Sequence, residues 1–253
     1  MNGISEGSFG AVSKVKYEDS NVAVLKVAHK STAISRRMFK HEAEMMAMAN
    51  GAGRVPRILA LGWDKPAMVM TYCTHPSLEN LVQRDAITTM PQFLSIFKST
   101  AKCLRALHKA GIVHCDIKED NILVNLNKSK AYIIDLGLAV KINEKCHMLG
   151  KHKMSTHEQH KHYDPVIWVG GRATPATDVY SLGYIFKDLM EMWVNDKVFP
   201  AVDQEILTLC DTMMDYDPAK RPSIKVVIIT LSRRLRLLTG GGDKNKSHPS
   251  DKE

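Results

Sequence analysis

Residues 114–121 read His-Cys-Asp-Ile-Lys-Glu-Asp-Asn, and residues 135–137 read Asp-Leu-Gly. Transfer of a phosphoryl group needs a carboxylate that positions and deprotonates the attacking hydroxyl, a cation beside the moving phosphate, and oxygen ligands for magnesium. The two runs supply all of these parts, in Asp116, Lys118, Asn121 and Asp135. They therefore point to phosphoryl-transfer chemistry.

The same runs resemble two motifs of the eukaryotic protein kinase family, the catalytic loop His-Arg-Asp-x-Lys-x-x-Asn and the metal-binding Asp-Phe-Gly. Cys115 and Leu136 are the departures from these motifs. By resemblance, Asp116 receives the proton of the substrate hydroxyl, while Asn121 and Asp135 bind Mg²⁺. ATP and Mg²⁺ are therefore the expected cofactors.

Residues 5–12, Ser-Glu-Gly-Ser-Phe-Gly-Ala-Val, look like the glycine-rich loop of this family. Missing side chains at such glycines let backbone N–H groups approach phosphate oxygens. Ser5 replaces the usual first glycine, and only three residues precede Ile4, so we expect a shortened first strand. The ATP contacts that the resemblance implies in this segment are Ile4, Gly7, Ser8, Phe9, Gly10 and Val12.

Residues 22–27 form a β-rich stretch with one lysine, Lys26, among apolar neighbours, which suits a strand that presents an ammonium group to phosphates. Strand alternation places Val24 on the same face as Lys26. By resemblance, Val12 and Val24 form the roof over the adenine ring, and Leu123 forms its floor.

Such a lysine needs a carboxylate partner, and residues 37–50 read as a helix that ends at an Asn-Gly signal. Its apolar stripe consists of Phe39, Ala43 and Met46. Glu42 falls within this stripe, whereas Glu44 lies about 200° further round and should face solvent. We therefore expect Glu42 to pair with Lys26; the alternative is that Glu42 is a surface charge.

Two more strands are expected at residues 55–63 and 67–72. The second leads into Met70, Thr71, Tyr72 and Cys73, which sit where the family's hinge presents backbone groups to adenine. Met70 matches the gatekeeper position. Residues 1–73 are accordingly expected to form the smaller lobe.

Helical periodicity dominates after residue 73. One apolar stripe runs from Phe93 to Leu107, with Pro91 near its start and Gly111 just past its end. A hairpin at residues 122–134 follows, and a buried helix opens near Asp178, which matches the aspartate that braces the family's catalytic loop.

The expected fold is α+β and bilobal, like that of a protein kinase. A small antiparallel β-sheet with one main helix occupies residues 1–73, with its first strand shortened. A mostly helical lobe follows at residues 74–239, and residues 240–253 form a disordered tail.

Some residues depart from the family pattern near the end of the segment that follows Asp135. The family's Ala-Pro-Glu appears here as Asp-Pro-Val at residues 164–166, so the glutamate that would pair with Arg221 is missing. A buried guanidinium without a partner is strongly unfavourable, and Asp164 is the candidate replacement. Gln159 and His162 stand at the spacings of the usual threonine and tyrosine.

Composition indicates an ordinary globular protein: 253 residues, 44% hydrophobic and 25% charged. The formal charge of +8 lies mostly in two local clusters rather than in a basic stripe interleaved with aromatic residues, so we expect no nucleic-acid partner.

No apolar run reaches the roughly 20 residues of a membrane span. The five cysteines are scattered along the chain, which favours reduced thiols. The expected location is cytoplasmic or nuclear, without membrane attachment.

One basic cluster is the run Arg-Arg-Leu-Arg at residues 233–236, and the other lies between Asp135 and Pro165. It interleaves Lys141, Lys145, Lys151, Lys153 and Lys161 with His147, His152, His157, His160 and His162. By resemblance this segment borders the groove for the protein substrate, so its charge favours acidic residues around the phosphorylated position. Zinc binding by Cys146 and these histidines is the alternative, although their spacing fits none of the usual pairs.

Three functions fit these residues. The first is a serine/threonine protein kinase acting on protein substrates, since Lys118 two residues after Asp116 favours such hydroxyls by resemblance. The second is a pseudokinase that serves as a nucleotide-binding or scaffolding module, and the third is a small-molecule phosphotransferase of related fold. The sequence does not indicate an oligomeric state.

Overall fold

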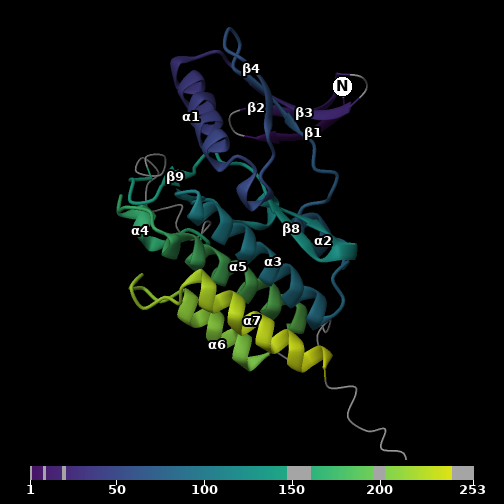
Figure 1. The fold of residues 1–253 in the computed structure, drawn as a ribbon, viewed down its shortest axis with the longest axis vertical. Helices are drawn as coiled ribbons and strands as arrows, with labels where there is room; N and C mark the ends of the chain where they lie inside the picture. Colours follow the sequence, from purple (N-terminus) through teal and green to yellow (C-terminus); the bar gives the residue numbers. More distant parts are fainter. Residues whose placement is uncertain (1, 8–9, 19–20, 147–160, 196–202, 241–253) are drawn as a thin grey trace, which may run out of the picture.

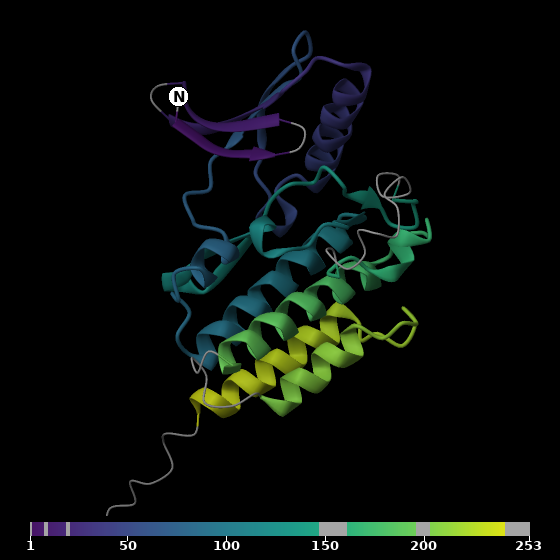
Figure 2. The ribbon, with the colours of Figure 1, turned by 180° about the vertical axis from the view of Figure 1, so that it is seen from behind.

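The computed structural model describes residues 2–7, 10–18, 21–146, 161–195 and 203–240. A β-sheet and one long helix stand at one end of the molecule, and a larger group of helices fills the other end (Figure 1). The view from behind shows the same division (Figure 2). The expected α+β fold, with an antiparallel sheet followed by a helical region, is confirmed.

The sheet has five antiparallel strands in the order β1-β2-β3-β5-β4. They are β1 (Asn2–Gly7), β2 (Gly10–Tyr17), β3 (Asn21–Ala28), β4 (Ile58–Gly62) and β5 (Ala67–Thr71). The edge strand β1 has six residues against eight in β2. β4 is shorter than the expected strand at residues 55–63, because a 3₁₀ turn at Ala52–Arg54 and Pro56 precede it.

Register places the candidate nucleotide contacts on one face of this sheet. Val12 lies opposite Lys26, and Val24 lies opposite Met70. Directly opposed residues share a face, and so do residues two apart on one strand. Val12, Val24, Lys26 and Met70 therefore point to the same side.

Helix α1 (Ala33–Ala49) packs beside the sheet (Figure 1). It begins four residues before the expected start, because Thr32 and Ser35 form a reciprocal capping box at its N-terminus. Its end is as expected, with Asn50 in the left-handed region at φ 43°. Glu42 is buried on this helix, whereas Glu44 is exposed.

The other elements belong to the larger, mostly helical part of the chain. Its helices are α2 (Leu78–Val82), α3 (Met90–Lys109), α4 (Pro165–Trp168), α5 (Pro175–Asn195), α6 (Gln204–Met213) and α7 (Ile224–Thr239), and two 3₁₀ turns cover Glu119–Asn121 and Leu126–Lys128. Short strands pair as β6 (Ile112–Val113) with β9 (Val140–Lys141) and as β7 (Ile122–Asn125) with β8 (Lys130–Ile133).

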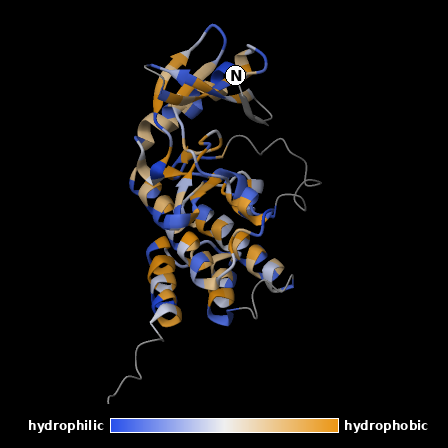
Figure 3. Ribbon diagram, turned by 90° about the vertical axis from the view of Figure 1, so that its right-hand side faces the viewer, coloured by the Kyte–Doolittle hydropathy of each residue, from blue (hydrophilic) through white to orange (hydrophobic). Residues whose placement is uncertain are grey.

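The core of this part lies between α3 and α5. Phe97 stacks on Phe186 with ring centroids 3.5 Å apart, and Phe93 packs edge-on against Trp193. α7 lies along α3, and α6 lies along α5 (Figures 1 and 2). Figure 3 shows hydrophobic positions distributed along these helices among hydrophilic ones, as amphipathic packing requires.

No helix in the described ranges is long and apolar enough to cross a membrane. All five cysteines are free thiols, and four of them are buried. The expected tail falls almost entirely on residues 241–253, which lie outside the described residues.

Candidate active site

Lys26 joins three parts of the chain. Its Nζ on β3 lies 2.8 Å from both carboxylate oxygens of Glu42 on α1, and 3.6 Å from Oδ1 of Asp135. Burial disfavours the charge on Lys26, but attraction to Glu42 and Asp135 outweighs it and raises the pKa of the ammonium. The expected pairing of Lys26 with Glu42 is confirmed.

Asp178 on α5 holds the backbone that precedes Asp116. Its Oδ2 accepts from the backbone N–H of His114 at 2.9 Å, and its Oδ1 accepts from that of Cys115 at 2.9 Å. His108 on α3 adds a third contact, with Nε2 2.8 Å from Oδ2. These bonds fix Cys115 at φ 64°, an unusual backbone conformation for a side chain other than glycine.

His114 connects this loop to the run that carries Asp135. Its Nδ1 accepts from the backbone N–H of Asp116 at 3.2 Å, so Nε2 carries the proton that it donates to the carbonyl of Ile134 at 3.0 Å. The next residue, Asp135, has φ 62°, and its Oδ1 accepts from the N–H of Gly137 at 3.1 Å. The ring of His114 thus sets the relative position of the two motifs.

Both carboxylate oxygens of Asp116 have partners. Nδ2 of Asn121 lies 2.9 Å from Oδ2, and Nζ of Lys118 lies 3.5 Å from the same oxygen. The hydroxyl of Tyr163 donates to Oδ1 at 2.7 Å. Burial alone would raise the pKa of Asp116, but His162, whose Nε2 lies 3.9 Å from Oδ1, the charge of Lys118 and the hydrogen bond from Tyr163 together lower it.

Asn121 and Asp135 carry oxygen atoms of the kind that binds magnesium. Asn121 turns its amide nitrogen toward Asp116, where it also donates to the backbone carbonyl at 2.8 Å, and this leaves the amide oxygen as the atom available to a cation. Asp135 keeps a side chain that is 45% exposed. Hard oxygen donors of this kind suit Mg²⁺, which usually takes few protein ligands.

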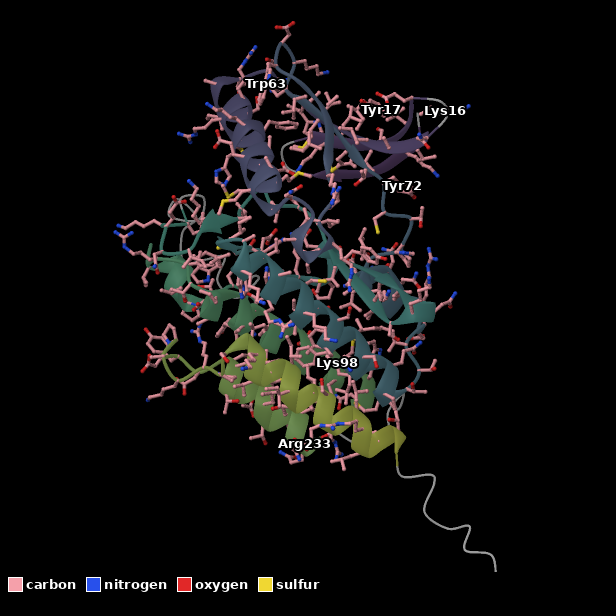
Figure 4. The ribbon with its side chains drawn as sticks, viewed as in Figure 1. Lys16, Tyr17, Trp63, Tyr72, Lys98 and Arg233 are labelled. Carbon is pink, nitrogen blue, oxygen red and sulfur yellow. The ribbon has the colours of Figure 1, made fainter. Side chains whose placement is uncertain are left out.

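The candidate adenine contacts lie where the sheet connects to the helices. Met70 is buried and Thr71 ends β5, while Tyr72 follows on the chain that leaves the sheet (Figure 4). Nζ of Lys14 lies 4.9 Å from the centroid of the Tyr72 ring. Leu123 is half-buried and forms a β-bridge with Ser77 beyond this connection.

The glycine-rich loop is described only in part. Gly7 pairs with Gly10 at the end of the β1–β2 hairpin. A Cβ on Gly10 would lie 2.5 Å from the carbonyl oxygen of Val27, so no larger residue fits there. Ser8 and Phe9 lie outside the described residues, and so do Gln159 and the histidines at positions 147–160.

Two residues near Pro165 have contacts that the motif comparison did not establish. Asp164 takes the place of the missing glutamate and forms a buried pair with Arg221. Tyr163 contacts Asp116, although we compared only Gln159 and His162 with the family pattern. No signal in the sequence distinguished Tyr163, because it stands one residue away from the position that the family pattern marks.

The whole arrangement agrees with the comparison to known families, in which the model of the protein kinase domain matches residues 1–230. The chain belongs to the protein kinase family. Its relatives include a probable serine/threonine-protein kinase, gdt4, of Dictyostelium discoideum, with 26% identity across 97% of this chain.

Two further kinases have similar identity. One is dual specificity tyrosine-phosphorylation-regulated kinase 2 of Drosophila melanogaster, with 26% identity over 95% of this chain. The other is serine/threonine-protein kinase PknK of Mycobacterium tuberculosis, with 30% identity over 71%. The matched regions cover 16% of gdt4, 32% of the Drosophila kinase and 16% of PknK, so this chain corresponds to a minor part of each relative.

Proposed function

We propose that this chain transfers the γ-phosphate of ATP, with Mg²⁺, to serine or threonine hydroxyls of protein substrates. The observation that carries the proposal is the position of Lys26, whose ammonium contacts both Glu42 and Asp135. This contact brings the sheet, α1 and the metal-binding motif to one point. An ATP phosphate bound there would contact the Lys26 ammonium, which the two carboxylates hold in place.

Each polar residue of the site has a role in this proposal. Lys26 binds phosphate oxygens, and Asn121 and Asp135 are the residues that would hold a magnesium ion, which would neutralise phosphate charge. Asp116 positions the substrate hydroxyl and accepts its proton late in the transfer. Lys118 then stabilises negative charge on the transferring phosphoryl group.

Lys118 and the names of the relatives support serine and threonine as acceptors. Two of the three relatives above are named serine/threonine kinases, and the third is named a dual-specificity kinase. Lys118 lies 3.5 Å from Asp116, close enough to act on the same acceptor. Phosphoamino-acid analysis of a labelled substrate tests this preference, and phosphotyrosine as the main product would contradict it.

A preference for acidic flanking residues is a further part of the proposal. Lys141, Lys145 and Lys161 are all exposed on the segment between Asp135 and Pro165. Glu79, Glu119 and Asp120 form a cluster of carboxylates that interact with one another, and such a cluster favours basic residues instead. A peptide library distinguishes the two, since a basic consensus would contradict the role given to these lysines.

A pseudokinase is the second candidate, because Tyr163 already occupies one oxygen of Asp116. The deciding experiment incubates the protein with labelled ATP, magnesium and protein substrates. Incorporation that Asp116→Asn abolishes, while nucleotide-induced thermal stabilisation persists, supports the kinase. Stabilisation without incorporation supports the pseudokinase, and label only in small metabolites supports a small-molecule phosphotransferase.

The control is Asp85→Asn, which changes the same functional group at an exposed turn where φ is 49°. Asparagine tolerates this left-handed conformation, so the variant should fold normally. Loss of incorporation in Asp85→Asn as well would mean that the effect of Asp116→Asn is not specific to the site.

A further inference from the structure

Tyr163 stands where the acceptor alcohol of a substrate has to bind. A catalytic base must lie within roughly 2.6–3.2 Å of the hydroxyl whose proton it takes. The phenol of Tyr163 is 2.7 Å from Oδ1 of Asp116. The other oxygen, Oδ2, is held by Asn121 at 2.9 Å and faces Lys118 at 3.5 Å. Oδ1, which lies 3.9 Å from Nε2 of His162, is therefore the oxygen left for a substrate, and the hydroxyl of Tyr163 already uses it.

The position of Tyr163 is built into the fold. The residue is 7% exposed and is the most buried of the seven tyrosines in the chain. It packs in a small apolar cluster with Val113, Cys115, Val140, Cys146, Ile167 and Ala173. Its ring also meets Trp168 edge-on, with centroids 5.8 Å apart.

The residue after Tyr163 also anchors this position. Asp164 is fully buried and paired with Arg221, so the backbone at Tyr163 is anchored to the helical core. The ring centroids of His162 and Tyr163 lie 4.2 Å apart. Tyr163 is thus held by packing within its cluster and by the anchored backbone of its neighbour Asp164.

The nucleotide half of the site is arranged differently. Lys26 is already paired with Glu42 and close to Asp135, and Asp178 already holds the catalytic loop. These contacts involve no residue of the segment that carries Tyr163. The structure therefore combines an assembled phosphate side with an occupied acceptor side.

We propose that Tyr163 is an internal competitor of the protein substrate: its hydroxyl holds Oδ1 of Asp116, and the acceptor alcohol binds productively only after Tyr163 has moved away. The inference rests on the proposed kinase function and adds a regulatory contact to it. A hydrogen bond to a charged group favours the closed state by about 10- to 150-fold. Productive acceptor affinity is lowered by the same factor, whereas ATP binding is not affected.

The test is Tyr163→Phe, which removes the hydroxyl and keeps the ring in its cluster. We expect the KM for a peptide substrate to fall at least tenfold and the KM for ATP to stay unchanged. Tyr216→Phe is the matched control, because Tyr216 is 83% exposed and does not belong to the apolar cluster that holds Tyr163. A fall in kcat with an unchanged peptide KM would overturn the inference, since it would make Tyr163 a positioning residue; unchanged kinetics would overturn it too.

A second measurement does not depend on turnover or on the variant. Wild-type protein labelled with 3-fluorotyrosine should show one fluorine signal shielded from a soluble paramagnetic agent, which is the buried Tyr163. Addition of peptide substrate with a non-hydrolysable ATP analogue should expose this signal. A signal that stays shielded would overturn the inference. If ATP binds to neither the wild type nor Tyr163→Phe, and neither protein incorporates label, the proposed function itself fails. That outcome differs from an active kinase whose Tyr163 does not move.

Discussion

Arg221 and Asp164 form an ion pair that is completely buried. Nη1 of the guanidinium lies 2.6 Å from Oδ2 of the carboxylate, and Nη2 lies 3.0 Å from Oδ1. Arg221 also donates to the carbonyls of Asp215 and Ala176, and its guanidinium lies 5.0 Å from the ring centroid of Tyr180. All of the charge on this arginine is therefore compensated inside the protein.

Removal of Asp164 should destabilise the fold strongly. Asp164→Ala leaves Arg221 charged and buried without its partner, which typically costs about 3–5 kcal/mol. The control is Asp211→Ala, which breaks the exposed pair of Asp211 with Lys187 and should cost less than about 1 kcal/mol. Urea unfolding measures both, and equal effects would contradict the importance given to burial.

The contact of Lys26 with Glu42 should govern nucleotide use. Glu42→Gln removes the charge that keeps the Lys26 ammonium in place, so we expect kcat/KM for ATP to fall about tenfold or more, which corresponds to about 1.4 kcal/mol. Glu44→Gln, on the exposed side of the same helix, should change it little. Kinetics at varied ATP concentration give both values, and equal losses would show that any charge on α1 matters.

Gly183 should be intolerant of a side chain because α5 and α6 are close at this point. A Cβ there would lie 2.7 Å from Cβ of Met213 and 3.2 Å from the carbonyl oxygen of Cys210. Alanine favours a helix over glycine by about 1 kcal/mol, but overpacking against a neighbouring helix costs about 1–3 kcal/mol. Since Met213 Cβ is fixed to its backbone, we expect the clash to dominate and Gly183→Ala to lower the melting temperature.

Gly62→Ala is the control for this prediction. A Cβ on Gly62 would find its nearest neighbour at 3.6 Å, an ordinary contact distance. This variant should therefore melt within a degree or two of the wild type, as about 0.5 kcal/mol or less would allow. A Gly183→Ala protein as stable as the wild type would mean that α6 can shift without loss.

Glu79 should make stability depend on pH. A hydrogen bond with Asp120, followed by burial, raises the pKa of Glu79 to about 7 from 4.5. The folded protein therefore keeps this proton at pH values where the unfolded chain loses it, so the free energy of unfolding should fall as the pH rises from 4.5 to about 7. Urea unfolding across this range measures the slope, and Asp120→Asn should flatten it. A slope that survives in Asp120→Asn would assign the effect to other groups.

Local patterns in the sequence were enough to place most elements and the pairing of Lys26. The apolar stripe of α1 identified its buried face, and Glu42 lies on that face because helical geometry repeats every 3.6 residues. The predicted start of α1, at residue 37, was wrong. The helix begins at Ala33, because the cap formed by Thr32 and Ser35 extends it beyond its apolar stripe. Short-range chemistry of this kind can be read from neighbouring residues.

Contacts between distant segments depend on how the helices pack. The sequence indicated that Arg221 lacks its usual partner and named Asp164 as a candidate, but only the fold brings these residues, 57 positions apart, into a bidentate pair. Tyr163 reaches Asp116 across 47 positions for the same reason. Motif spacing therefore determined which polar groups the site contains, whereas long-range packing decided which side chain contacts Asp116. A hydrogen bond requires atoms within about 3 Å, and sequence separation does not define that distance.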